Sequence, residues 1–482
     1  MIMGVFMEIE KIPEIKRESL IKRCLKILKD VFLRLYNGVK NFFNIFLNGT
    51  IVTKLSFIIM GLGCAFRGQI IKGILYFCLE LCYIVYMATF GWLYLKDIIT
   101  LGTNSQIQVW DEELQIYLNK PGDNSMLILL FSVVTIFVTL AFIGIYISSI
   151  KAGYKCEVLR RMGKKPRTFK EDLKSLLDEN YHKTLLTVPM LGTICFTILP
   201  LIFMILIAFT NFDKTHQPPG NLFTWVGLQN FKDVFWDNPL KSYTFSKLFV
   251  WTMIWAICAT FSNYILGMIL AILINKKGIK GKGFWRTIFV LTIAVPQFVT
   301  LLLMSKLLHD SGPINVLLQY LGISPIHFLT NGKIAKIVVI VVNMWVGIPY
   351  SMLITSGILM NIPEDIYESA KIDGASPITT FFKITLPYML FVTTPYLITQ
   401  FIGNINNFNV IYLLTGGGPA SLKYFQAGET DLLVTWLYKL TVNEQNYSLA
   451  STIGIIIFVI CAVLSLLTYN MSASVKKEDT FQ

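Results

Sequence analysis

The sequence predicts an all-α membrane protein with about eight transmembrane helices, and three observations support this fold class. Of the 482 residues, 54% are hydrophobic and only 15% are charged, a balance that differs from that of soluble globular proteins. Lys and Arg are concentrated in alternate connections between apolar blocks. The blocks approach or exceed the roughly 20 residues that cross a bilayer, and they lie near 70–95, 126–150, 184–210, 247–275, 286–307, 335–359, 387–410 and 448–470.

The N-terminal segment, residues 1–50, is basic and amphipathic. Apolar side chains such as Leu25, Leu28, Phe32 and Leu35 recur among Lys and Arg at about helical spacing. Such a helix is typical of the inner membrane surface, but a solvated cytoplasmic tail has the same composition, and both interpretations remain open. The first residues lack a short apolar run with a cleavage site, so we expect no signal peptide.

Residues 51–150 are expected to form two additional N-terminal spans with a lead-in. The stretch 51–66 is apolar but too short to cross a bilayer, and Arg67 follows it. We interpret it as an interfacial or re-entrant segment that precedes the first span. The six later blocks, within 184–470, then form the main transmembrane domain.

The distribution of Lys and Arg predicts the orientation of the spans. The connections 151–183 and 276–286 are basic, and Lys476 and Lys477 follow the last span in the tail 471–482. With eight spans, these segments, the N-terminus and 361–387 lie on one side, which the positive-inside rule assigns to the cytoplasm. The net charge of +13 is therefore attributed to the cytoplasmic loops of a membrane protein, and not to a surface for nucleic acid.

The connection 361–387 is expected to form a helix, a sharp turn and a second helix. Pro363 suits the first position of a helix, and Gly374 offers a left-handed stop. Ser376 then supplies an N-cap, and Pro377 the first residue of the second helix. Small residues around Gly374 keep this elbow thin, so that another surface can approach its backbone.

Polar residues form a stripe on one face of each of two predicted spans. The seventh span carries Gln400, Gly403, Asn404 and Asn407 at i, i+3, i+4 and i+7, with Thr393 and Tyr396 extending the face, and the sixth carries Asn343, Gly347, Tyr350 and Ser351. Side-chain amides are costly in lipid, so the stripes face protein or a water-filled cavity. A sugar path and interhelical hydrogen bonding are both consistent with them.

No sequence feature indicates catalysis, a metal site or another cofactor. No GxxxxGK[ST] run occurs, and Gly416–Pro419 is interpreted as an external turn because no Lys-Ser/Thr pair follows it. The His and Cys residues lack metal-ligand spacing. We therefore expect that this chain is not an enzyme, that it holds no cofactor, and that any ATP hydrolysis coupled to it takes place on a separate subunit.

One alternative functional class for a chain with this many spans is the ion-coupled secondary transporter. Such carriers commonly hold an ionisable group at mid-membrane. Glu80 is the clear acidic exception within the predicted spans, and it lies outside 184–470. This pattern favours transport without ion coupling.

The elbow resembles the cytoplasmic loop of ABC-importer permeases. That loop has Glu-Ala-Ala, a Gly and an Ile-x-Leu-Pro run, and Glu368-Ser369-Ala370, Gly374 and Ile384-Thr385-Leu386-Pro387 stand in the same register, with Ser369 where the family usually has Ala. The resemblance implies that the elbow is the coupling helix that docks on a cytosolic ATPase. The implied coupling residues are Glu368, Ser369, Ala370, Asp373, Gly374, Ala375, Ile384 and Pro387.

Residues 184–470 resemble the larger, MalF-type membrane subunit of maltose/maltodextrin ABC importers. The similarity is carried by the local runs Trp225–Leu228, Asn230–Phe231, Asn343–Tyr350, Asn406–Asn409 and Thr430–Val434. The chain departs from the Gram-negative subunit between the third and fourth spans, where 211–246 replaces a large folded domain. Contacts of that domain with a binding protein are therefore not transferred to this chain.

The resemblance implies the permease subunit of a binding-protein-dependent ABC importer for maltodextrin-like oligosaccharides, with a galacto-oligosaccharide or another glycan as the alternative substrate. The implied partners are a second homologous permease, two cytosolic ATPase subunits, an extracellular solute-binding protein and membrane lipid. Together with the polar stripes, the resemblance assigns sugar binding to Val346, Gly347, Tyr350, Gln400, Gly403, Asn404 and Asn407. Gly403 stands where the maltose subunit has Phe, which suits a roomier site.

Overall fold

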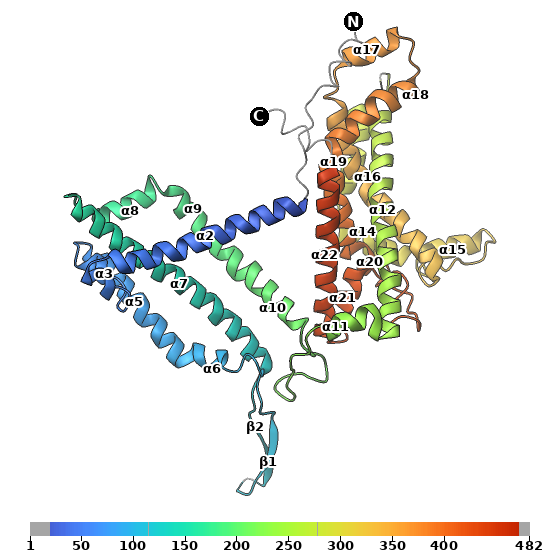
Figure 1. The fold of residues 1–482 in the computed structure, drawn as a ribbon. Coiled ribbons are helices and arrows are strands. Elements are labelled where there is room, and N and C mark those ends of the chain that lie inside the picture. The colour runs from blue at the N-terminus through green and yellow to red at the C-terminus, as the bar shows by residue number, and fades with distance from the viewer. Residues whose placement is uncertain (1–19, 114, 277, 472–482) are drawn as a thin grey trace. The chain divides into compact units, whose positions relative to one another are not determined.

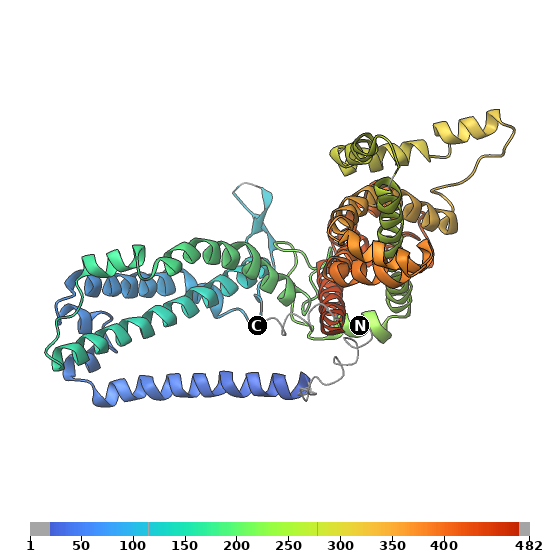
Figure 2. The same cartoon turned by 90° about the horizontal axis from the view of Figure 1, so that it is seen from above.

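Helices dominate the structure, a computed structural model that describes residues 20–113, 115–276 and 278–471 (Figure 1, Figure 2). This confirms the predicted all-α class. The chain divides into two compact units. Unit 1 comprises Met1–Ile98 and Leu127–Pro200, and unit 2 comprises Ile99–Met126 and Leu201–Gln482.

Within the described ranges, seven helical segments are long and apolar enough to cross a membrane, and one bent pair raises the number to eight. The seven are Ile70–Leu95, Ser125–Arg161, Tyr181–Ile207, Pro239–Asn275, Gly332–Leu359, Pro377–Ile405 and Tyr447–Thr468. Each of the eight predicted blocks overlaps one of these segments or the bent pair.

The bent pair corrects the predicted fifth block, 286–307. Helices α13 (Lys282–Ala294) and α14 (Gln297–Leu307) meet at 86°. The cause is local, because Pro296 lacks the N–H that would continue the helix and holds Val295 in an extended conformation, with φ −75° and ψ 125°. The apolar run is therefore a broken span or a re-entrant loop.

Unit 1 contains the N-terminal helices and most of α7. Their bounds are α2 Leu20–Asn48, α3 Ile51–Leu55, α4 Leu62–Ala65, α5 Ile70–Tyr86, the π-helical turn η2 Met87–Gly91, α6 Trp92–Leu95, α7 Ser125–Arg161, α8 Phe169–Leu177, α9 Tyr181–Thr193 and η3 Ile194–Ile198. The predicted lead-in, 51–66, contains two short helices and packs against α7. Arg67, 6% exposed, pairs there with Glu157, 3% exposed, at 2.7 Å.

A β-hairpin was not predicted. Strands β1 (Ile107–Asp111) and β2 (Ile116–Lys120) pair antiparallel, with Ile107 opposite Lys120. Their β-branched and aromatic residues favour strands, but at five residues each they give a weak sequence signal. The hairpin lies in the connection between the first two predicted spans.

Unit 2 contains the remaining helices. They are α10 Leu199–Ile207, α11 Gln229–Lys232, η4 Asp233–Asp237, α12 Pro239–Asn275, α13, α14, α15 Pro313–Tyr320, α16 Gly332–Leu359, α17 Glu364–Ile372, α18 Pro377–Thr380, η5 Phe381–Thr385, α19 Leu386–Ile405, α20 Phe408–Thr415, α21 Leu433–Val442 and α22 Tyr447–Met471. Figure 1 shows α17 and α18 at one end of this unit and α11 and α21 at the other.

The core of unit 2 is built around two Trp side chains that are fully buried. Trp436 packs among apolar residues of α19, α21 and α22, and Trp255 packs among residues of α12, α14, α16 and α20. Helices α12 and α16 approach closely, because a Cβ at Gly267 would come within 2.6 Å of Ser351 Cβ. Asn238 and Asn331 cap the first turns of α12 and α16 with their side chains.

The predicted seventh span, 387–410, ends earlier than expected. Helix α19 stops at Ile405, and Asn407 is the N-cap of α20, with its Oδ1 accepting from the Val410 N–H at 3.3 Å. An Asn at this position satisfies one of the free N–H groups of the next helix. Asn407 therefore does not lie on a helical face continuous with Gln400.

Candidate functional site

A cavity of about 450 Å³ lies among the helices of unit 2. Its walls come from α12, the break between α13 and α14, α16, α19 and the start of α20. None of the residues that line it, all in the described part of the chain, is charged. The polar ones are Thr260, Asn263, Thr292, Gln297, Thr300, Asn343, Tyr350, Ser351, Tyr396, Gln400, Asn404 and Asn407.

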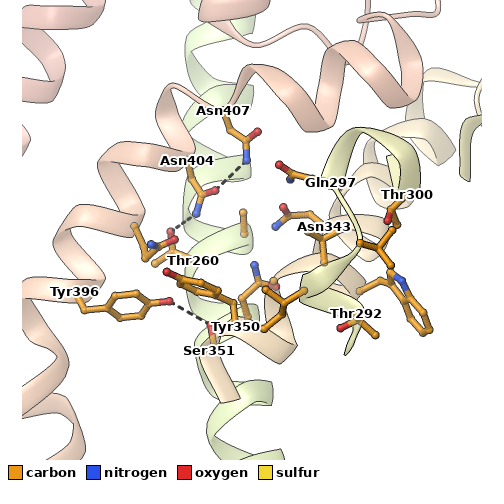
Figure 3. A pocket seen from close by; sticks show the side chains of 18 of the residues that line it. Thr260, Thr292, Gln297, Thr300, Asn343, Tyr350, Ser351, Tyr396, Asn404 and Asn407 are labelled. Carbon is orange, nitrogen blue, oxygen red and sulfur yellow. Dashed lines mark hydrogen bonds between the residues drawn. The ribbon is translucent and has the colours of Figure 1, made fainter. Parts of the chain in front are cut away.

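The predicted sugar-binding residues, except for Gly403, line this cavity. They are Val346, Gly347 and Tyr350 on α16, Gln400 and Asn404 on α19, and Asn407 beyond its end. Figure 3 shows Asn404 and Asn407 on one side of the cavity, facing Asn343 and Gln297. The two polar stripes therefore meet.

Asn404 and Asn407 also hold the helices around the cavity together. Asn404 is buried and donates from Nδ2 to Thr260 Oγ1 at 2.9 Å, while its Oδ1 accepts from Asn407 Nδ2 at 3.3 Å. The Asn404 carbonyl accepts from Trp255 Nε1 at 3.1 Å. These bonds link α19 to α12. Asn404 and Asn407 therefore line the cavity and also make structural hydrogen bonds, so that a sugar path and interhelical packing, the two interpretations of the polar stripe on the seventh span, involve the same residues.

Two other lining amides have polar atoms without a protein partner. Asn343 is 5% exposed and its Nδ2 has no hydrogen-bond partner among the described residues, nor has the buried Oδ1 of Asn263. A buried polar atom left unpaired costs about 1–3 kcal/mol. One is a donor and the other an acceptor, which are the two functions that a ligand hydroxyl can satisfy.

The aromatic side chains of the cavity differ in exposure. Tyr350 is 51% exposed, whereas Tyr396 is half-buried, with its hydroxyl 3.5 Å from Ser351 Oγ. Thr393, expected to extend the polar face, is instead buried and lies 2.7 Å from the Tyr264 hydroxyl. Tyr350 is therefore a lining residue with a ring surface open to a ligand.

Five polar lining residues were not predicted: Thr260, Asn263, Thr292, Gln297 and Thr300. Three of them flank the break at Pro296, and the Val-Pro pair was the signal for that break. Asn263 is an amide in the long apolar helix α12, which is itself unusual in lipid. Their contribution adds a third and fourth wall that the two stripes alone did not reveal.

The elbow has the predicted left-handed turn. Gly374 has φ +73°, the Ala375 N–H donates to the Ala370 carbonyl at 2.9 Å, and Ser376 Oγ accepts from the Thr379 N–H at 3.2 Å. These bonds close α17 and begin α18. One detail differs: Pro363 is the residue before the helix, and Glu364 is its first.

The elbow presents a mixed surface. Glu368, Ser369 and Asp373 are exposed, whereas Ala370 is buried and Ala375 and Ile384 are half-buried. Pro387 lies exposed in the first turn of α19. Two large apolar side chains also project from it, Ile372 at 86% and Ile378 at 72% exposure. Exposed apolar groups of this size are typical of a docking surface.

A second cavity, of about 820 Å³, lies beneath the elbow and reaches Asn275 at the end of α12. Asn275 Nδ2 donates to Ser356 Oγ of α16 at 2.9 Å, and the Asn275 carbonyl accepts from Lys282 Nζ at 2.9 Å. Arg286 of α13 also donates to Asn275 Oδ1. Asn275 thus joins three helices that line the first cavity.

The connection after α20 is held by a buried carboxylate. Asp431 is fully buried and accepts from Lys439 Nζ at 2.6 Å and from the Gly428 N–H at 2.7 Å. Gly416 and Gly417 have φ +60° and +78°, which confirms the turn predicted for Gly416–Pro419.

Comparisons with known proteins agree with this architecture. The family described as "Binding-protein-dependent transport system inner membrane component" matches residues 263–477. The galactooligosaccharides transport system permease protein GanP of Bacillus subtilis is 35% identical over 429 residues, covering 89% of this chain and 99% of that protein. The maltodextrin transport system permease protein MalC of Streptococcus pneumoniae is 35% identical, with 88% and 96% covered.

Two further similarities cover just over half of the chain and somewhat under two thirds of it. The maltose/maltodextrin permease MalF of Salmonella typhimurium is 39% identical over 267 residues, which is 54% of this chain and 51% of that protein. A chain of a bacterial alginate ABC transporter crystal structure shares the fold, with a TM-score of 0.52 at 22% identity, over 63% of this chain and 98% of that chain. GanP and MalC are each 35% identical to this chain and are covered over 99% and 96% of their own lengths. This chain therefore belongs to the family of binding-protein-dependent transport-system inner-membrane components, which are multi-pass membrane permeases of ABC transporters.

Proposed function

We propose that this chain is the permease subunit of an ABC importer for neutral oligosaccharides of the maltodextrin or galacto-oligosaccharide class. The observation that carries the proposal is the uncharged cavity into which the Tyr350 ring and amides from α12, α14, α16 and α19 converge. The names of the relatives that align over nearly their whole length support this substrate class.

The cavity chemistry suits a sugar. Each sugar hydroxyl both donates and accepts hydrogen bonds, and side-chain amides do the same. Asn343 Nδ2 and Asn263 Oδ1 would gain partners from a bound hydroxyl, while Tyr350 offers a face for the apolar side of a pyranose. We expect sugar binding in this cavity to be transient, with the affinity supplied by an external solute-binding protein.

The elbow is proposed to bind the cytosolic ATPase and to transmit its motion. Its thin turn at Gly374 and the exposed Ile372 and Ile378 form the contact surface. Motion would pass through Asn275, which bonds to α13 and α16 near the elbow. Helix α12 then continues to Thr260 and Asn263 in the cavity wall.

The working complex is proposed to contain a second related permease, two ATPase subunits and an external solute-binding protein. Both termini and the elbow are assigned to the cytoplasm, from the asymmetry of Lys and Arg among the connections. With this orientation, the connection that Asp431 holds through its bonds to Gly428 and Lys439 is proposed to face the binding protein.

Uptake of labelled oligosaccharides by cells with and without this chain tests the proposal. Maltotriose and a galacto-trisaccharide should include at least one substrate, and a uronic-acid trisaccharide of similar size is the matched charged control. Accumulation should stop when ATP is depleted and survive an uncoupler that removes the ion gradient. Uptake that follows the ion gradient would instead support a secondary transporter and refute the proposal.

A further inference from the structure

Helix α2 carries an apolar stripe that no described residue covers. Phe32, Tyr36, Val39, Phe43 and Leu47 recur every three or four residues and therefore lie on one face. They are exposed, Phe32 by 69%, Phe43 by 62% and Leu47 by 68%. An exposed apolar stripe along a 29-residue helix requires an apolar environment in the working protein.

The same helix is strongly basic. The described side chains Lys26, Lys29, Arg34 and Lys40 are exposed, and Asp30 is the sole acidic residue in the sequence Leu20–Asn48. Lys26, Lys29 and Lys40 lie along one edge of the apolar stripe on a helical projection, where long side chains can extend outward while their stems lie along apolar groups. The helix thus combines an apolar face with a positive edge.

The C-terminal part of α2 is fixed at a definite level along α7. The Phe42 ring lies 5.0 Å from Phe57 and 6.4 Å from Tyr146, and Ile45 is buried. The apolar run of α7 ends at Ile150, one turn after Tyr146, and Lys151 follows. This end of α2 therefore lies where hydrocarbon gives way to lipid headgroups.

Two other occupants of the stripe fit less well. As a membrane span, α2 would place its Lys and Arg side chains in hydrocarbon, which is unfavourable, and it is not among the candidate spans found in the described residues. A second copy of this chain would bring two basic helices together. A bilayer surface with anionic headgroups satisfies the stripe and the charges at once.

We propose that α2 lies on the membrane surface as an anchor that prefers anionic lipid. Phe32, Tyr36 and Phe43 enter the boundary between headgroups and acyl chains, and the flanking Lys side chains contact the anionic headgroups. The proposal does not depend on the transported substrate, and its test does not measure transport.

The test places a photoreactive benzoyl-phenylalanine at Tyr36 or Phe43 of the full chain, in nanodiscs of phosphatidylglycerol or of phosphatidylcholine. The matched control carries the probe at Asn41, which lies on the opposite, polar face of α2. After illumination, intact-mass spectrometry counts adducts of lipid mass. In phosphatidylglycerol, both apolar-face probes should give at least fivefold more lipid adducts than the Asn41 probe.

Lipid charge and helix charge form the second arm of the test. The adduct yield at Phe43 should fall several-fold in phosphatidylcholine, and also in phosphatidylglycerol for Lys26→Glu/Lys29→Glu/Lys40→Glu. Equal yields on both faces, equal yields in the two lipids, or adducts between two protein chains would each overturn the proposal. The comparison of lipids uses the native charges, so it stays decisive if the triple variant misfolds.

Discussion

The side-chain amide of Asn263 lies against the backbone of Gly347, so closely that a Cβ added at Gly347 would come within 2.1 Å of Asn263 Nδ2. Asn263 belongs to α12 and Gly347 to α16, and both line the central cavity. The absence of a side chain at Gly347 thus allows an amide to reach the cavity wall.

We predict that Gly347→Ala lowers sugar uptake per assembled complex several-fold, because Asn263 must move from its position. Adding Asn263→Ala should restore part of the uptake, since the smaller side chain removes the overlap, and the pair should be non-additive. Gly357→Ala on the same helix is the matched control, because a Cβ there meets no atom within 4 Å. If Gly347→Ala and Gly357→Ala change uptake per assembled complex equally, the close contact between Gly347 and Asn263 does not matter for transport.

Asn343 provides a test that separates binding from packing. Its buried Nδ2 has no hydrogen-bond partner within 20–113, 115–276 and 278–471. We therefore expect Asn343→Val to leave the free energy of unfolding unchanged or to raise it by about 1 kcal/mol or more, while oligosaccharide uptake falls several-fold. The measurements are the melting temperature of the purified protein and uptake per assembled complex.

Asn315→Val is the matched control for this prediction. Asn315 is also buried, but its amide bonds to the Ile326 backbone through both Nδ2 and Oδ1 and lies outside the cavity. That variant should lose stability and keep normal uptake per complex. Unchanged uptake by Asn343→Val would remove Asn343 from the sugar site.

Gly374→Val tests the elbow. Its φ of +73° is unfavourable for a branched residue by about 1–2 kcal/mol, and the added side chain would widen a turn proposed to enter the ATPase. We expect normal insertion, weak co-purification of the ATPase and loss of uptake.

Gly163→Val is its matched control, because Gly163 has φ +71° and a Cβ there also meets no atom within 4 Å. It should carry similar strain and retain uptake. If both variants transport equally well, the elbow lacks the proposed role.

The proposed orientation is tested by thiol labelling of intact cells, in a background without native Cys. Single Cys at Ser105, Asn221 or Ser421 should react with an impermeant reagent, and Cys at Lys164 or Ser376 should react only after the membrane is opened. Ready labelling of Lys164→Cys in intact cells would reverse the assignment.

The sequence predicted the helical spans and the elbow because their signals are local. Apolar runs are recognised from the hydropathy of consecutive residues. In the elbow, Gly374 ends one helix and Ser376-Pro377 begins the next within a few residues. The break at Pro296 was missed because residues on both sides of it are equally apolar, so hydropathy carries no information about helix direction.

The cavity was only partly predictable, because its lining depends on where helices end and on how they pack together. A helical wheel placed Gly403 and Asn407 on the face of Gln400, but the helix ends at Ile405, and Gly403 does not line the cavity. Asn407 reaches it as the cap of another helix. Asn263 faces the cavity because Gly347 leaves room on a neighbouring helix, a relationship that exists only after packing.

The buried ion pair in unit 1 allows a prediction about assembly. Arg67 and Glu157 are 2.7 Å apart, and Arg67 also donates to Thr53 Oγ1 at 2.7 Å. Glu157→Gln would leave the Arg67 guanidinium buried without its counter-charge, a change that typically costs about 3–5 kcal/mol. We expect a large loss of folded protein in the membrane, measured by thermal stability and by the monodisperse fraction after extraction.

Replacing both partners should be far less harmful than replacing one. Arg67→Met/Glu157→Met removes both charges and fills the space with apolar groups, which is commonly neutral or stabilising. Arg167→Gln is the matched surface control, because its pair with Glu179 is solvent-exposed, and it should leave stability unchanged. If Glu157→Gln is as stable as the native chain, the pair does not hold the lead-in against α7. If the double variant is no more stable than Glu157→Gln, the loss comes from the surrounding hydrogen bonds and not from an unpaired buried charge.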